Sequence, residues 1–412
     1  MRRVVVTGVG AISPIGNNAT DMWESMKKGV CGIDRITYYD TENKKVKLAG
    51  EVKNFDPIEV FGKFKARKLD PFVMFALVAA KEAMEQANID LQKEDLLRCG
   101  VIIAGGIGGL GTIKREAAKG EEKGYEWISP NFIPMSIINM AAGQVAIEYG
   151  FHGMCSSVVT ACAGGSNAIG DSFRQIRDGY QDVMICGGSE SCINELGMSG
   201  FSAMNALSVS EDKNRASIPF DKERTGFVMG EGSGILVLEE YEHALKRNAE
   251  ILCEITGYGV SCDAYHVTAP LEDGSMAAEC MKAAMEDAKI EPFDIDYINA
   301  HGTSTVMNDK AETLAIRKAF KEAADKIPVS STKSMTGHLL AAAGAVEAIA
   351  CVLSVRNDFI PPTINYRVSD EECNLDVVPN EGRNVCVNYA MTNSLGFGGH
   401  NASLIFKKYK QE

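Results

Sequence analysis

The stretch TACAGGSNAIGDSFRQIRDGYQDVMI, residues 160–185, indicates how the chain folds, because the chain contains a second version of it. TGHLLAAAGAVEAIACVLSVRNDFI, residues 336–360, has the same order of features: a turn of small residues, a helical pattern of about four turns, and Arg and Asp near its end. GVIIAGG, residues 100–106, is matched in the same way by YINAHGT, residues 297–303. Two pairs of similar segments in the same order predict a duplicated fold.

The duplication predicts two packed halves. A chain of 412 residues exceeds what one hydrophobic core usually supports. We place the seam near residue 250, which divides the chain into an N-terminal half, 1–250, and a C-terminal half, 251–412. No Pro-rich or Ser-rich linker separates them, so we expect the halves to be packed together rather than tethered.

Strand and helix patterns alternate along the chain, which predicts an α/β fold. Runs rich in β-branched residues predict strands at 3–7, 100–104, 182–186, 234–238, 251–258, 296–300, 328–331 and 385–391. Apolar residues at three- and four-residue spacing predict helices at 69–87, 276–288, 310–324 and 339–355.

Composition and charge indicate a soluble cytoplasmic protein. A net charge of −13 argues against general binding to nucleic acid or anionic membranes, so an acidic partner would need a local basic patch. The apolar run at the N-terminus is too short for a signal peptide, and we find no apolar stretch that approaches a membrane span of about 18 residues. The 12 cysteines include no Cys-x-x-Cys pair, which is typical of reduced thiols.

Two glycine-rich runs imitate nucleotide-binding loops without completing them. TGVGAIS, residues 7–13, has Ser13 where a dinucleotide-binding turn has Gly or Ala. AGGIGGLGT, residues 104–112, lacks the Gly-Lys-Ser/Thr ending of a phosphate loop, and we interpret it as backbone that lets another group pass closely. The six histidines form no cluster with zinc-ligand spacing. The chain is therefore predicted to use neither a nucleotide cofactor nor a catalytic metal.

Cys162 is a candidate nucleophile. If a helix begins right after it, the sulfur lies at a helix N-terminus, where free N–H groups and the dipole favour the thiolate. Gly164, Gly165 and the neighbouring alanines are expected to leave room for substrate beside the sulfur. The alternative is a buried cysteine packed by alanines, and this segment alone leaves both interpretations open.

Two further segments could bring catalytic groups to Cys162. In INAHGTST, residues 298–305, His301 stands where a strand ends and a glycine turn starts, which is where ligands gather in α/β folds. Lys333 and His338 precede the helix equivalent to the one behind Cys162, so a duplicated fold would bring both helix starts to one centre. The alternatives are a polar turn, a solvated lysine and a structural histidine.

These motifs resemble the signature blocks of the β-ketoacyl-[acyl-carrier-protein] synthases. TACAGG, NAHGTST, STKSMTGH and NSLGFGGHN occur in this order, and the resemblance covers essentially the whole chain. It implies a thiolase-like fold of layered αβαβα halves, a homodimer, acyl carrier protein as the partner, and no cofactor. The elongating type II synthases are resembled most; they join malonyl carrier protein to a cysteine-bound acyl chain with loss of CO2.

The resemblance implies catalytic roles at five positions. Cys162 would accept the acyl chain, giving an acyl-enzyme. His301 and His338 would donate hydrogen bonds to the malonyl thioester oxygen, with Lys333 ordering them. The N–H groups of Cys162 and Phe397 would form an oxyanion hole, and Phe397 would also gate the pocket.

Further binding residues follow from the same resemblance. Thr303 and Thr305 would bind the pantetheine arm, and Ile107 and Phe201 would line the acyl pocket. Glu312 would hold Lys333. A structural monovalent cation would lie near three side chains, Asn299, Glu347 and Asn393.

A basic cluster is predicted to dock the acidic carrier protein. GKFKARKLD, residues 62–70, holds the densest positive charge of the N-terminal half, from Lys63, Lys65, Arg67 and Lys68. A solvated basic helix start is the alternative.

Departures from the family pattern and other activities also matter. His400 stands where many relatives have Thr, and Met307 and Asn308 replace a pair of small residues, all beside the expected site. A thiolase would show a second cysteine near the C-terminal glycines, an initiating synthase would replace His338 with Asn, and a silent partner would lack Cys162. A specialised polyketide or polyene ketosynthase would use the same catalytic residues and is not excluded.

Overall fold

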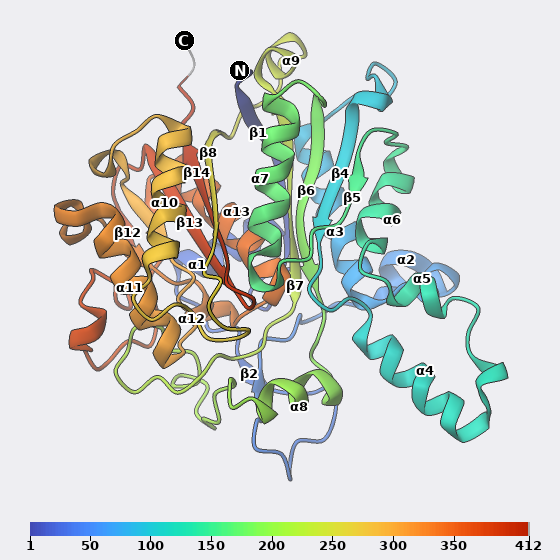
Figure 1. The fold of residues 1–412 in the computed structure, drawn as a ribbon. Coiled ribbons are helices and arrows are strands. Elements are labelled where there is room, and N and C mark those ends of the chain that lie inside the picture. The colour runs from blue at the N-terminus through green and yellow to red at the C-terminus, as the bar shows by residue number, and fades with distance from the viewer. Residues whose placement is uncertain (411–412) are drawn as a thin grey trace.

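The computed structural model describes residues 1–410, which form a ten-stranded mixed sheet with helices on its faces (Figure 1). The strands occur across the sheet in the order β10 (Val329–Ser330), β9 (Tyr297–Asn299), β13 (Tyr389–Gly396), β14 (His400–Lys407), β8 (Cys253–Cys262), β1 (Val4–Ile12), β7 (Gly232–Glu240), β6 (Val183–Glu190), β4 (Cys99–Ala104) and β5 (Cys155–Ser156). The predicted α/β class is confirmed.

The sheet has the same five-strand pattern on either side of the contact between β1 and β8. In each half the first strand is antiparallel to the second and the second to the third, in β1-β7-β6 and in β8-β14-β13. The fourth and fifth strands are then parallel, β4 and β5 following β6, and β9 and β10 following β13. This repetition agrees with a duplicated fold; the seam near residue 250 stays a prediction.

Helices complete the layers. Helix α3 (Pro71–Ala87) packs on β1 and β7, and α10 (Ser275–Ala288) packs on β8 and β14. Two central helices, α7 (Gly164–Arg177) and α13 (Ala343–Asn357), contact each other and strands of both halves. The expected αβαβα layering is therefore present, with α7 and α13 as its middle layer.

The two central helices begin with the same backbone turn. A 3-10 turn precedes each, η3 (Ala161–Ala163) before α7 and η6 (Leu340–Ala342) before α13. The first residue of each turn has positive φ, +48° at Ala161 and +50° at Leu340. Because positive φ is uncommon for residues other than glycine, its repetition at equivalent positions agrees with the internal similarity of the sequence.

Strand β13 starts later than predicted, and β14 was missed. Residues 385–388 bond to Asp358 and Asp296 instead of a neighbouring strand, so β13 begins only at Tyr389. Strand β14 follows directly after a turn at Gly398 and Gly399, two residues with positive φ. Its first residues are polar and give no alternating or apolar pattern from which a strand could be predicted.

The other predicted helices are present with small shifts at their ends. Helix α3 begins at Pro71, because Asp70 caps it by accepting from the Phe72 N–H at 3.4 Å. The remaining elements are α1 (Ala19–Lys27), β2 (Asp34–Arg35), β3 (Leu48–Ala49), α2 (Pro57–Ala66), η1 (Leu96–Arg98), α4 (Leu110–Lys123), η2 (Tyr125–Trp127), α5 (Phe132–Ser136), α6 (Met140–Tyr149), α8 (Glu195–Ala203), α9 (Tyr241–Lys246), η4 (Pro292–Asp294), α11 (Val306–Phe320), η5 (Lys321–Asp325), α12 (Lys333–Thr336), β11 (Phe359–Ile360), η7 (Glu371–Cys373) and β12 (Arg383–Asn384).

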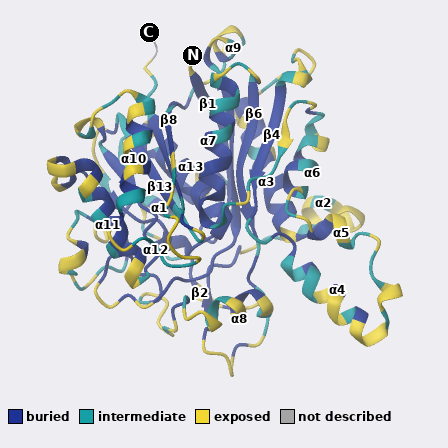
Figure 2. Ribbon diagram, viewed as in Figure 1, coloured by how far each residue is buried: buried dark blue, intermediate teal, exposed yellow. Residues whose placement is uncertain are grey.

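Helix α13 lies at the centre of the core (Figure 2). Residues 340–357 are long and apolar enough to cross a membrane by length and composition, and 83% of that window is buried inside the molecule. The expectation that no stretch approaches such a span was therefore wrong. Its alanines pack against both halves of the sheet, which is why a central helix here is apolar all round.

Candidate active site

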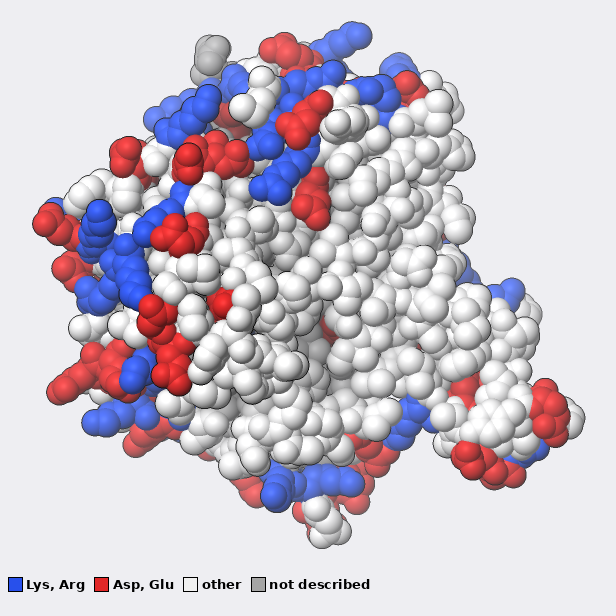
Figure 3. All heavy atoms as spheres, in the orientation of Figure 1, with Lys and Arg blue, Asp and Glu red and all other residues white. Residues whose placement is uncertain are grey.

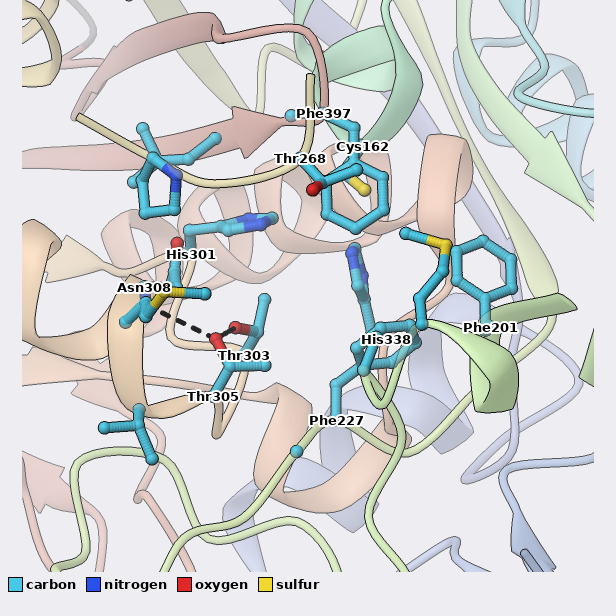
Figure 4. A pocket seen from close by; sticks show the side chains of 18 of the residues that line it. Cys162, Phe201, Phe227, Thr268, His301, Thr303, Thr305, Asn308, His338 and Phe397 are labelled. Atoms are coloured by element: carbon cyan, nitrogen blue, oxygen red, sulfur yellow. Dashed lines mark hydrogen bonds between the residues drawn. The ribbon is translucent and has the colours of Figure 1, made fainter. Parts of the chain in front are cut away.

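The candidate site is a cavity of about 310 Å³ that residues of both halves line. Cys162 and Phe201 come from the N-terminal half, and His301 and His338 from the C-terminal half. Both imidazole rings point toward the Cys162 sulfur, and the Phe397 ring lies beside it (Figure 4). The structure therefore brings together the residues that sequence analysis had chosen from separate motifs.

Cys162 lies in the turn η3, just before α7 begins at Gly164, as predicted. Its side chain is 7% exposed. Burial raises the pKa of the Cys162 thiol to about 12, although Lys333 and the Phe397 N–H act in the opposite direction. The backbone N–H groups beside the sulfur lower the pKa of the thiol, as expected of the helix start, but burial outweighs their effect.

The glycines after Cys162 do not make room for substrate. A Cβ atom on Gly165 would lie 2.7 Å from the Ala341 carbonyl oxygen, and one on Gly164 would lie 3.0 Å from the Ala104 Cβ. Both positions allow α7 to pack closely against α13 and β4. This corrects the sequence-based interpretation. Room beside the turn is needed elsewhere, since a Cβ on Gly396 would lie 3.2 Å from the Cys162 N.

The two histidines are buried and neutral. His301 and His338 have exposed fractions of 2% and 3%, and their rings lie 5.2 Å apart at 88°. Burial and the neighbouring Lys333 hold the pKa of each imidazole well below its usual value. Lys333 Nζ lies 3.3 Å from His301 Nδ1, and an ammonium group can only donate. His301 Nδ1 therefore accepts, which leaves its proton on Nε2.

The backbone of His338 is clamped on both sides. Its N–H donates to the Val228 carbonyl at 2.7 Å, and its carbonyl accepts from the Gly230 N–H at 2.9 Å. Phe227 packs edge-on against the imidazole, with ring centroids 5.3 Å apart. Sequence analysis missed Phe227, which stands in a loop of mixed composition without a periodic signal.

The carboxylate that holds Lys333 is Glu347, not Glu312 as predicted. Lys333 Nζ donates to Glu347 Oε1, and both side chains are buried. Glu312 instead accepts the N–H groups of His301 and Gly302, each at 2.7 Å, so it fixes the backbone of the first histidine. Glu347 is the single charged residue in the apolar pattern 339–355, and that isolation was the available signal.

A second buried carboxylate supports the same loop. Asp309 accepts the N–H groups of Phe220 at 2.8 Å and Ser304 at 3.2 Å, and Arg224 lies 3.5 Å from it. Asp309 therefore fixes the backbone of this loop in addition to lying in the first turn of α11. Arg224 was missed because one arginine in a loop usually lies in solvent.

The predicted binding residues differ in their placement. Thr303, Thr305 and Phe201 line the cavity, with the two threonine hydroxyls 3.0 Å apart. Ile107 does not line the open cavity but packs in one apolar cluster with Cys162 and Phe201.

Of the three departures from the family pattern, two reach the cavity. Met307 and Asn308 line it. His400 does not; it pairs across the sheet with Cys262 at the start of β14.

The basic cluster lies on and just after α2. Its four side chains, Lys63, Lys65, Arg67 and Lys68, are all exposed. Lys65 pairs with Glu148 at 2.8 Å, so part of the local charge is neutralised.

Fold and site together define a thiolase-like condensing enzyme, in which a cysteine at a helix start faces two neutral histidines. The family model described as Beta-ketoacyl synthase, N-terminal domain, matches residues 1–244, and the model of the C-terminal domain matches residues 252–367. The chain belongs to the β-ketoacyl synthase family.

Curated relatives and solved structures match over nearly the full length. A 3-oxoacyl-[acyl-carrier-protein] synthase 2 of Staphylococcus aureus is 50% identical over 409 residues, covering 99% of each chain. A synthase 2 of Synechocystis is 48% identical, again covering 99% of each. Among solved structures, a type II polyketide ketosynthase in complex with its acyl-carrier protein has a TM-score of 0.92 and 36% identity, covering 99% of this chain and 100% of that one.

Proposed function

We propose that this chain lengthens acyl groups on acyl carrier protein by two carbons through decarboxylative condensation with malonyl carrier protein. The observation that carries the proposal is the convergence of Cys162, His301 and His338 on one buried cavity. Curated synthases at 50% identity over nearly the whole chain support it. We expect the reaction to take place in the cytoplasm.

The first half-reaction acylates Cys162. Its sulfur attacks the acyl thioester, the bond from the acyl carbon to the carrier sulfur breaks, and the thiol proton ends on that carrier sulfur. The N–H groups of Cys162 and Phe397 face the sulfur and would stabilise the oxyanion that forms on the way. Because burial opposes a free thiolate, the proton leaves as the new bond forms.

The second half-reaction uses the histidines. Neutral His301 and His338 each donate from Nε2 to the malonyl thioester oxygen, so hydrogen bonds from uncharged imidazoles stabilise the enolate left by departing CO2. The enolate carbon then attacks the acyl carbon on Cys162, and the cysteine leaves and recovers a proton from water. One C–C bond breaks, one forms, and the product is a 3-oxoacyl carrier protein.

Intact mass spectrometry tests the nucleophile. Wild-type protein mixed with an acyl carrier protein thioester should gain the mass of one acyl group, and Cys162→Ala should gain none. Cys253→Ala, which removes another buried cysteine, is the matched control and should still be acylated. An adduct that persists in Cys162→Ala would refute the assignment.

We propose further that the carrier protein docks on the exposed basic side chains of α2 and the turn after it. Lys63→Glu and Arg67→Glu should raise KM for carrier protein about tenfold, in line with 1–2 lost charge contacts, and leave rates with a free pantetheine thioester unchanged. Lys282→Glu, on α10 in the other half, is the control. Equal effects on both substrates would contradict the docking site.

We also propose a homodimer, because an apolar surface is exposed beside the last strand of the sheet. The face over β5 and α6 carries almost no charged side chains (Figure 3), and β5 is the last strand of the sheet. Ile147 on α6 is 72% exposed and Val159, which follows β5, is 54% exposed, as expected of a surface that a second copy covers. Light scattering should give twice the chain mass for the wild type and the monomer mass for Ile147→Arg.

The residues expected to hold a monovalent cation fit that role in part. Asn299 Oδ1 and Glu347 Oε2 are buried without a hydrogen-bond partner among residues 1–410, and oxygen ligands of this kind suit such a cation. Asn393 fits less well, because its Oδ1 already accepts from Ser403 at 2.8 Å. A cation held by Asn299 and Glu347 would offset the carboxylate charge that Lys333 does not reach.

A specialised polyketide ketosynthase is the second candidate, because a ketosynthase of that kind has the same fold at 36% identity. The aromatic lining by Phe201 and Phe227 favours saturated acyl chains over polar polyketide intermediates. Parallel acylation assays with a saturated and a poly-β-keto thioester separate the two. Preference for the poly-β-keto chain would favour the alternative.

A further inference from the structure

Glu190 is a fully buried carboxylate that the proposed reaction does not use. It ends β6 with an exposed fraction of 0%. Its Oε2 accepts the Gly106 N–H at 2.8 Å, and its Oε1 accepts the Ile107 N–H at 3.3 Å. The Cys192 thiol lies 3.4 Å from Oε1. Within residues 1–410, no Lys, Arg or His side chain makes an ion pair with it; burial raises the pKa of Glu190, and backbone N–H groups act in the opposite direction.

Glu190 explains the glycine-rich run at residues 104–112. Two successive N–H groups aimed at one anion form a backbone nest, and the nest here holds the protein's own carboxylate. A Cβ atom on Gly106 would lie 2.5 Å from Glu190 Oε2, so a larger residue at this position would displace the carboxylate. The group that passes closely by this backbone is therefore a side chain of β6 and not a nucleotide.

The nest places Ile107 beside the nucleophile. Ile107 packs in the apolar cluster that contains Cys162, Phe201 and Leu340. Its N–H is bound to Glu190, so the carboxylate sets where the Ile107 backbone stands relative to Cys162. Phe201 and Leu340 of this cluster also line the cavity beside the Cys162 sulfur.

Glu190 also acts on Cys162 through its charge. Its carboxylate raises the pKa of the thiol, while Lys333 lowers it. The remaining groups that face the sulfur are the neutral His301 and His338 and the Phe397 N–H. Removing the Glu190 charge should therefore let the thiol ionise at lower pH.

We propose that Glu190 is a positioning residue of the acyl pocket: by holding the Gly106–Ile107 backbone, it determines which acyl lengths Cys162 accepts. The proposal rests on the proposed acylation of Cys162. It adds a specificity determinant that does not itself touch the substrate.

Glu190→Gln tests the proposal, because an amide has a single acceptor oxygen and cannot serve both N–H groups. The measurement is kcat/KM for acylation with hexanoyl and hexadecanoyl carrier protein. We expect the ratio of the two values to change by about tenfold, the effect of one lost buried hydrogen bond. The pH midpoint of Cys162 alkylation by iodoacetamide should also fall.

Glu231→Gln is the matched control. Glu231 is as deeply buried as Glu190 but accepts from Tyr38, from Ser191 at 2.9 Å and from the Val52 N–H at 3.1 Å, away from Ile107. It should leave both the acyl-length ratio and the alkylation midpoint at their wild-type values. Glu190→Asp, which keeps the charge, should keep the alkylation midpoint.

Gly106→Ala keeps the test decisive if Glu190→Gln does not fold, because its Cβ displaces the same carboxylate. A changed acyl-length ratio in either variant supports the proposal. Equal losses for both acyl lengths with an unchanged alkylation midpoint would overturn it and leave Glu190 a structural residue. Failure of the proposed function looks different, since the wild-type protein would then form no acyl adduct at all.

Discussion

The turns that begin α7 and α13 share a backbone and differ in chemistry. Ala161 and Leu340 start them with φ of +48° and +50°, and Cys162 on the first turn is matched by Ala341 on the second. The second region supplies His338, which stands before its turn instead of within it. The two turns therefore share one backbone, with the nucleophile in the first and a hydrogen-bond donor just before the second.

Charge separates the two regions as well. The buried residues of α7 include no ionisable side chain, whereas α13 buries Glu347 in contact with Lys333. A buried ion pair costs desolvation that hydrogen bonds must offset. The nucleophile therefore lies in a turn of small residues without a buried charge on its helix, whereas the neutral histidine pair has a fixed charge beside it.

The largest effect is expected from Lys333→Ala. It leaves Glu347 buried without its partner, and breaking such a pair costs about 3–5 kcal/mol of the free energy of unfolding. It also frees the proton position on His301, so decarboxylation should fall by about 10²-fold or more. Urea unfolding and CO2 release measure the two effects.

The double variant Lys333→Met, Glu347→Gln is the control for Lys333→Ala. It removes both charges and should regain most of the stability, while decarboxylation stays low because His301 has lost its donor. A Lys333→Ala variant as stable as the wild type would contradict the role given to this ion pair.

The packing of the two helices is tested by Gly165→Ala. Its Cβ would lie 2.7 Å from the Ala341 carbonyl oxygen, so α7 and α13 must move apart, at a cost of about 1–3 kcal/mol of unfolding free energy. Gly200→Ala on α8 has no atom within 4 Å of the new Cβ and should be stabilising by up to about 1 kcal/mol. If both substitutions changed the free energy of unfolding in the same direction, close helix packing would not be the function of Gly165.

The pH dependence of the half-reactions should differ. Burial raises the pKa of Glu347 to about 7, so acidification through this range protonates the carboxylate that holds Lys333. Decarboxylation should therefore fall on the acid side of about pH 7, by up to tenfold per pH unit. The contribution of Glu347 to the free energy of unfolding has the opposite pH dependence. Because its pKa is raised, the native state binds the proton more tightly than the unfolded chain, so this contribution decreases as pH rises from about 4.5 to about 7.

Glu347→Gln should remove that acid limb, because no proton is then taken up at this position. Acylation of Cys162, followed by mass spectrometry over the same pH range, should not show the limb in either protein. An identical limb in acylation would show that protonation of Glu347 controls the nucleophile as strongly as it controls the histidines.

The smallest effect is expected from Ala161→Gly. The left-handed conformation costs an alanine about 1–2 kcal/mol, and the greater freedom of glycine in the unfolded chain offsets much of the gain. The free energy of unfolding should change by less than about 1 kcal/mol, with acylation unaffected. Ala168→Gly inside α7 should destabilise by about 1 kcal/mol, because glycine is a poor helix former. A destabilised Ala161→Gly would contradict the strained turn.

The fold was largely predictable because its repeats are local. The strands that flank the central helices are continuous β-branched runs, and the two helix starts repeat the same pattern of small residues within one chain. Strand β14 was not predictable in this way, since its pairing with β8 depends on a turn at Gly398–Gly399 and not on its own composition.

The site was predictable where one motif carries one role. Cys162, His301 and His338 stand at element ends, and the structure gathers them. Contacts set by the packing of separate elements were not predictable. Lys333 pairs with Glu347 on α13 and not with Glu312, and burial has the largest effect on the pKa of the Cys162 thiol. Such outcomes depend on three-dimensional packing, which no local pattern encodes.

The division of work between the two helix starts is tested most directly by His338→Ala, in one assay that follows both half-reactions. Protein is mixed with acyl and malonyl carrier proteins, and the acyl mass on Cys162 is read together with the CO2 released. We predict that His338→Ala acquires the acyl group at close to the wild-type level and releases CO2 at least about 10²-fold more slowly. Loss of the acyl adduct in parallel with CO2 release would contradict separate roles for the two regions.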